Sequence, residues 1–180
     1  VTGVQTCALP ISAATFAGSC FGAAASLYVR DILLRGPSML AAISAFIGAG
    51  TICGAAISGR FFTRFRNPLT FVRGGMTTAS ASLLSFAGIR NESTALAASL
   101  VLGCGVGAVT VAAAALLQGQ TPPHLRGRIS GLSAAFISFA QLAALLLSGS
   151  LVTWISVPAL LVFSSAVLFA AAFSVGAETG

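Results

Sequence analysis

Long apolar runs separated by short polar connections make up most of this chain. A bilayer core about 30 Å thick requires a helix of about 20 apolar residues. Six segments approach or reach that length, at about 12–29, 38–58, 69–89, 94–117, 129–150 and 156–175. Strands do not fit, because the runs are long and rich in Ala, Leu, Gly and Ser instead of alternating β-branched residues. The pattern predicts an all-α, polytopic membrane protein with six transmembrane helices.

The composition points to lipid as the solvent. The chain is 57% apolar and only 7% charged, with a mean hydropathy of +1.00, whereas a soluble domain has about 25% charged residues. The chain has too few polar residues to cover a folded surface in water. The four Cys, at positions 7, 20, 53 and 104, form no cluster and no CxxC motif, so neither a disulfide framework nor a metal site is predicted.

The charge distribution predicts an orientation. All nine basic residues are Arg. Eight fall between the apolar runs and Arg73 lies just inside the third run, which fits anchoring at a membrane surface and not nucleic-acid binding. The connections after the second and fourth helices hold Arg60, Arg64, Arg66, Arg126 and Arg128. The other connections hold Arg30, Arg35 and Arg90, partly offset by Asp31 and Glu92. The positive-inside rule therefore predicts that the even-numbered connections and both termini are cytoplasmic, in a bacterial inner membrane.

Residues 1–11 match the translation of a common sequencing-adapter oligonucleotide. We expect them to be an artefact and leave them out of the fold. The expected organisation is then a six-helix bundle over 12–175 and a cytoplasmic tail over 176–180.

Glycines at a spacing of four residues predict close helix packing. In lipid, helices associate through close backbone approach, which small residues permit. Three such pairs occur: Gly18 with Gly22, Gly50 with Gly54, and Gly103 with Gly107. Gly131, one turn into the fifth predicted helix, is expected to allow close packing as well.

The basic connection around residues 120–132 carries the most distinctive motif. Thr121 is placed to N-cap a short interfacial turn, with Pro122 at the first helical position, where a missing N–H costs nothing. Arg126 and Arg128 flank Gly127 and can reach lipid phosphates, helix carbonyls or acidic partners. The alternative is a basic loop that is merely solvated.

This motif carries a family resemblance. The pattern Thr-Pro-x-x-Leu-Arg-Gly-Arg-x-x-Gly-Leu, after a helix that ends in Leu-Gln, resembles the connection between helices ten and eleven of major facilitator superfamily transporters. It is closest to the branch of the enterobactin exporter and the macrolide-efflux permeases. The stretch 49–60 resembles the eighth helix of that branch running into its cytoplasmic loop. The resemblance covers about 12–175, the C-terminal six helices of a twelve-helix protein, and implies two inverted three-helix repeats.

The resemblance also assigns gate residues. It implies that Gly59, Arg60 and Arg64 belong to the cytoplasmic gate, together with the motif that ends at Gly131. The sequence departs from the family where Pro123 and His124 replace acidic residues, and where Thr63 and Arg66 replace the Asp and Gly of the second basic loop. These departures remove partners from the charge relay of the gate.

Polar residues inside membrane helices are candidates for a transport path. Gln141, near the middle of the fifth helix, and Thr110, in the middle of the fourth, are the best candidates, and hydrogen bonding between helices is their alternative role. None of the six predicted helices contains an acidic residue. A carboxylate that couples transport to protons would therefore lie outside this half.

The expected function is that of a fragment of a secondary active transporter, an efflux permease for small amphipathic molecules or siderophores. Alternating access would place the substrate between this bundle and an absent N-terminal six-helix half. Expected partners are the lipid bilayer, the absent N-terminal half and a small-molecule substrate.

Catalytic and phosphate-binding motifs (GxSxG with a transmembrane His, HExxH, GxxxxGK[ST]) are absent from the sequence, so we expect no enzymatic activity and no cofactor. A self-contained six-helix structural or assembly protein is the main alternative, and a homodimeric six-helix transporter is a weaker one.

Overall fold

The computed structural model describes residues 15, 18–22, 24–61, 68–88, 90–120, 126–152 and 156–177. Its elements are a π-helical turn η1 (Tyr28–Ile32) and the helices α2 (Pro37–Phe61), α3 (Pro68–Gly88), α4 (Glu92–Gln120), α5 (Arg126–Val152) and α6 (Val157–Ala177). Residues 18–22 and 24–27, ahead of η1, are also helical. Every element within these described ranges is helical, which confirms the all-α class.

The helix starts follow local chemistry. Pro37 and Pro68 are the first residues of α2 and α3, where a missing N–H costs no intrahelical hydrogen bond. Glu92 stands in the first turn of α4, where its negative charge complements the helix dipole. The backbone N–H of Ala95 donates to the carbonyl of Asn91 at 3.0 Å, which closes that turn. These signals place the helix starts close to the predicted ones.

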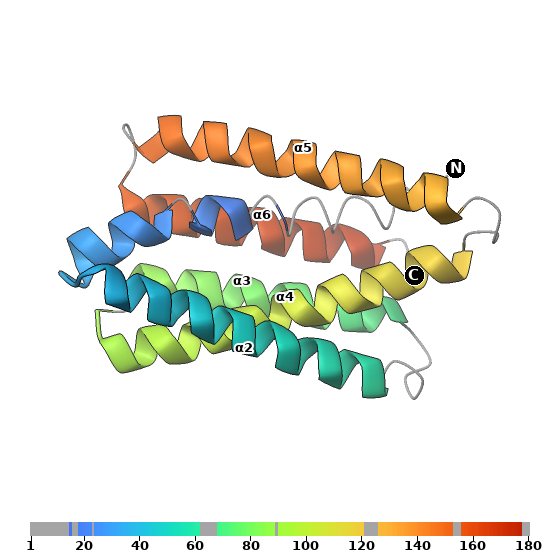
Figure 1. Ribbon diagram of the computed structural model, residues 1–180, viewed down its shortest axis with the longest axis horizontal. Coiled ribbons are helices and arrows are strands. Elements are labelled where there is room, and N and C mark those ends of the chain that lie inside the picture. The colour runs from blue at the N-terminus through green and yellow to red at the C-terminus, as the bar shows by residue number, and fades with distance from the viewer. Residues whose placement is uncertain are drawn as a thin grey trace.

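The helices lie side by side along the long axis of the molecule (Figure 1). The most extensive contact joins α2 to α4, while α3 packs against both α4 and α6. Helix α5 lies at the edge of the bundle, beside α6, and makes few contacts with it. The bundle therefore has a closely packed part, made by α2, α3, α4 and α6, and one nearly separate helix.

An aromatic cluster closes one end of the core. Tyr28 in η1 and Phe86 near the end of α3 are fully buried. Their rings meet edge to face with centroids 5.5 Å apart, and the ring of Phe21 lies 5.0 Å from that of Phe86. Such pairs add stability beyond the area they bury. This cluster holds the first helical segment against α3.

The predicted count of six spans is not confirmed. Four of the described helices are long and apolar enough to cross a membrane, over 37–60, 92–116, 127–147 and 157–174. Helix α3 has 21 residues but is not among them. Its sequence includes Thr70, Thr77, Thr78, Ser80, Ser82, Ser85 and Arg73, which lower its hydropathy. The first predicted segment, 12–29, is described and helical at 15, 18–22 and 24–29, whereas its other residues, like residues 1–11, lie outside the described part of the chain. The inverted-repeat arrangement stays a prediction.

Candidate transport faces and gate residues

Four glycines bring α2 and α4 into backbone contact. A Cβ built on Gly50 or Gly54 would overlap the backbone of Leu100 or Cys104 on α4. A Cβ on Gly103 or Gly107 would likewise overlap the backbone of α2. Both predicted glycine pairs in these helices are therefore confirmed as close-packing positions. Gly18 and Gly22, by contrast, have no atom within 4 Å of an added Cβ, so the predicted packing is not seen there.

Helix α3 is attached to its neighbours through glycine and serine. A Cβ on Gly75 would come within 2.7 Å of Val109 on α4. The Ser82 hydroxyl donates to the carbonyl of Ala98, also on α4, at 2.6 Å. Burial of an unpaired hydroxyl costs free energy, and the hydrogen bond from Ser82 removes that cost. The polar residues of α3 that sit inside the bundle are therefore matched to neighbouring helices.

A reciprocal serine pair joins α3 to α6. The Ser80 hydroxyl donates to the carbonyl of Ser165 at 3.0 Å, and the Ser165 hydroxyl donates to the carbonyl of Ser80 at 3.1 Å. The two hydroxyl oxygens are 3.2 Å apart and both side chains are buried. The two residues are 85 positions apart in the sequence, so no local pattern predicts this contact.

Helix α5 exposes most of its surface. Ala144 is fully buried on the side facing α6, whereas Phe136 and Phe139 are 64% and 71% exposed. The opposite side carries a stripe of small and polar residues, all exposed, which we call the α5 face: Gly127, Gly131, Ala134, Ser138 and Gln141. Their spacing places them on one side of the helix. Close packing at Gly131 is not seen in the described bundle, because no atom lies within 4 Å of an added Cβ, and it stays a prediction.

The two candidate path residues lie on different helices and are not brought together. Gln141 is exposed on the α5 face. Thr110 is exposed on α4, and its hydroxyl donates to the carbonyl of Gly107 in the same helix at 3.0 Å. This bond is intrahelical and does not support the alternative role of Thr110 as a link between helices. Helices α4 and α5 are not among the pairs in extensive contact.

The gate residues that the structure describes gather at one end of the bundle. Helices α2 and α4 end, and α3 and α5 begin, at the right-hand end of Figure 1. Gly59 and Arg60 are exposed in the last turn of α2, and Gly127 and Arg128 are exposed in the first turn of α5. Arg126 is the first residue of α5. The predictions for Arg64, Thr121 and Pro122 fall outside the described residues.

The opposite end of the bundle carries nearly balanced charge, with Arg30, Arg35 and Arg90 set against Asp31 and Glu92. Arg35 forms an ion pair with Glu92 at the start of α4. Arg30 approaches Asp31 at 3.7 Å. Arg60, Arg73 and Arg128 lie toward the other end, where the described residues include no carboxylate. The described bundle is therefore polarised, with excess positive charge at the end that holds the gate residues.

Comparison with known proteins gives a distant match. No protein-family model matches the chain. The proton myo-inositol cotransporter of Homo sapiens is 29% identical to it over 111 residues, which is 60% of this chain and 16% of the cotransporter. The chain thus spans less than a fifth of that protein's length. Together with the four apolar helices, this similarity to part of a cotransporter indicates an integral membrane protein. The enterobactin-exporter and macrolide-efflux branch is not confirmed and stays a prediction.

Proposed function

We propose that this chain is one six-helix half of a secondary active transporter that moves a small molecule by alternating access. Support at the coarse level comes from the similarity to a cotransporter and from the apolar helices. The alternative of a self-contained structural or assembly protein is not favoured, because nothing in that similarity points to it.

The observation that carries the proposal is a pair of unpartnered helix faces built from small residues. The α5 face is one. The second, which we call the α2 face, lies opposite the α4 contact and carries exposed Ala41, Ala45, Gly48, Ala49 and Ala56 around Ile52, which is 73% exposed. Small residues mark helix–helix contact in membranes, because they let backbones approach closely. Two such faces on different helices fit a bundle that packs against a further set of helices, which is the role of the proposed absent half.

The site residues take their roles from this arrangement. Gln141 lies on the α5 face, so it would line the boundary between the halves, where transporters of this kind bind substrate. Thr110 is proposed as a second lining residue from its exposed position on α4. Arg60, Arg64, Arg126, Gly127 and Arg128 are proposed to anchor and shape the cytoplasmic gate, together with Gly59, Thr121, Pro122 and Gly131.

The charge asymmetry supports an orientation. Under the positive-inside rule, the end with Arg60, Arg73 and Arg128 faces the cytoplasm. The proposed membrane is the bacterial inner membrane, with both termini on the cytoplasmic side.

The two sources of similarity suggest different substrates. The loop motif resembles efflux permeases, which favours export of small amphipathic molecules or siderophores. The relative is named for proton and myo-inositol transport, which favours a polyol taken up with protons. Asp31 and Glu92, the described carboxylates, lie at helix ends. A coupling carboxylate is therefore proposed to belong to the absent half.

The test is transport by a reconstituted protein. A longer reading frame that supplies six further helices ahead of this bundle should be expressed and placed in proteoliposomes. We expect it to move either an amphipathic dye or myo-inositol along an imposed proton gradient, while the 180-residue chain alone moves neither. Gln141→Ala should reduce transport by the longer protein, and Ser85→Ala, exposed on α3, is the matched control. Net flux through the 180-residue chain alone would overturn the proposal.

A further inference from the structure

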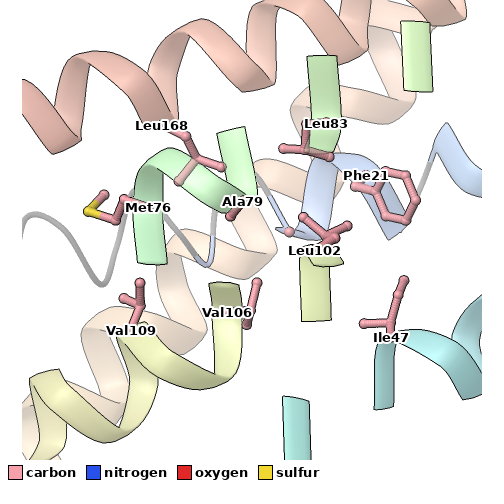
Figure 2. Close-up of a pocket in the computed structure, with 10 residues that line it drawn as sticks. Phe21, Ile47, Met76, Ala79, Leu83, Leu102, Val106, Val109 and Leu168 are labelled. Carbon is pink, nitrogen blue, oxygen red and sulfur yellow. The ribbon is translucent and has the colours of Figure 1, made fainter. Parts of the chain in front are cut away.

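A partly open cavity lies among the closely packed helices of the bundle, with exposed Gly18 in its lining. It has a volume of about 150 Å³. Side chains from five helical segments line it, as Figure 2 shows: Phe21, Ile47, Ala79, Leu102 and Leu168 represent one segment each. Met76, Leu83 and Val109, which also line it, are almost completely buried. The cavity is therefore a feature of the core and is distinct from the α2 and α5 faces.

The described lining is apolar throughout. Its side chains are those of Phe, Ile, Met, Leu, Val and Ala, together with Gly18. A buried water needs two to four polar partners, so a cavity with this lining stays dry. Ions are excluded for the same reason, because a charge without partners is costly to bury. What such a space can hold is a small apolar molecule.

We propose that this cavity is a binding site for one small apolar molecule of about the size of benzene. A cavity of about 150 Å³ lined by Leu, Ile and Phe is known to bind benzene or xenon in a soluble protein. In a bilayer the competing solvent is hydrocarbon, which also attracts such a ligand. The cavity still binds the ligand more favourably, because its space exists before binding, whereas dissolving the ligand among acyl chains requires work to make a new cavity. The ligand also gains dispersion contacts with wall atoms that otherwise face a void.

Fluorobenzene binding to the 180-residue chain in lipid nanodiscs tests this site. We expect a saturable ¹⁹F NMR signal from one bound molecule per chain, in addition to the linear partition seen with empty nanodiscs. Ala79→Leu puts three further carbons into the cavity and should abolish the saturable signal. The matched control is Leu84→Ala on the same helix, because Leu84 is 53% exposed and does not line the cavity. This variant should bind as the parent chain does.

A second variant keeps the test decisive if Ala79→Leu fails to fold. Leu83→Ala enlarges the cavity, so it should admit fluorotoluene, which the parent chain should bind far less. Circular dichroism confirms the helical fold of each variant. The proposal is overturned if the parent chain shows only the partition of empty nanodiscs, or if neither Ala79→Leu nor Leu83→Ala alters saturable binding. Neither result depends on transport.

Discussion

Helices α2 and α5 show two different ways in which a membrane helix meets its surroundings. On one side α2 is locked against α4 through Gly50 and Gly54, with the two backbones in direct contact. Helix α5 makes few contacts with α6, and no atom lies within 4 Å of a Cβ added at Gly127 or Gly131. Both helices carry small residues at helical spacing, yet among the described residues Gly50 and Gly54 of α2 have a partner helix, whereas Gly127 and Gly131 of α5 have none. Small residues therefore mark where a partner helix can sit, and do not show whether this chain supplies it.

The energetic contrast follows from the contacts. At the α2–α4 contact, the space for any side chain is already filled by backbone atoms that cannot rotate away. At the α5 face, an added side chain meets nothing within the described bundle. Substitution of glycine by a large residue should thus strongly destabilise the fold at the α2–α4 contact and leave its stability unchanged at the α5 face.

The largest effect is expected from Gly54→Leu. A Cβ at this position would stand 2.8 Å from the Cα of Cys104, so the two helices must separate. Overpacking against backbone of this kind costs about 3 kcal/mol or more. We expect a clear loss of thermal stability of the 180-residue chain in mild detergent, measured by circular dichroism.

Two controls separate this contact from glycine loss in general. Gly48→Leu lies on the exposed side of the same helix, and Gly131→Leu lies on the α5 face. Both should leave the melting temperature unchanged or raised, because Gly is about 1 kcal/mol worse than Ala or Leu in a helix interior. If Gly131→Leu destabilises the isolated chain as strongly as Gly54→Leu, the contrast between the two helices is wrong.

The contrast between α2 and α5 also shows which helix contacts could be predicted from the sequence. The four-residue spacing of Gly50, Gly54, Gly103 and Gly107 predicted close packing, and the structure confirms it. The same spacing at Gly18 and Gly22 meets no partner within the described residues, because spacing defines a face but carries no information on what lies opposite. Hydropathy identified α2, α4, α5 and α6 as spans. It could not anticipate that the buried serines of α3, Ser80 and Ser82, donate hydrogen bonds to α6 and α4.

A smaller effect is expected at the contact between α3 and α6. Removal of both hydroxyls of the Ser80–Ser165 pair eliminates two hydrogen bonds between helices. Bonds of this type in membrane proteins contribute about 0.6 kcal/mol on average and up to about 1.7 kcal/mol. A double-mutant cycle with Ser80→Ala and Ser165→Ala should give a coupling free energy in that range.

The control for this cycle is a neighbouring serine of α6, which bonds to Leu160 of its own helix and to Cys20 instead of to Ser80. Ser164 donates to the carbonyl of Leu160, four residues earlier in α6, at 2.9 Å. Ser80→Ala combined with Ser164→Ala should therefore show almost no coupling. Equal coupling in the two cycles would mean that the effect arises from general loosening of α6 and not from the reciprocal pair.

The smallest effect is expected at the charged end opposite the gate residues. Arg35 precedes α2 and Glu92 begins α4, so their ion pair joins the two helices that also meet through glycine. The side chains are 60% and 43% exposed, so water and salt weaken the attraction. Exposed pairs of this kind contribute at most about 1 kcal/mol. Arg35→Gln should thus lower stability slightly, and the difference from the parent chain should vanish in high salt.

Arg30→Gln is the matched control, because its partner Asp31 is adjacent in the sequence and the pair does not join two helices. If Arg35→Gln destabilised the chain as much as Gly54→Leu, the α2–α4 contact would depend on charge, and the dominant role given to its glycines would be wrong.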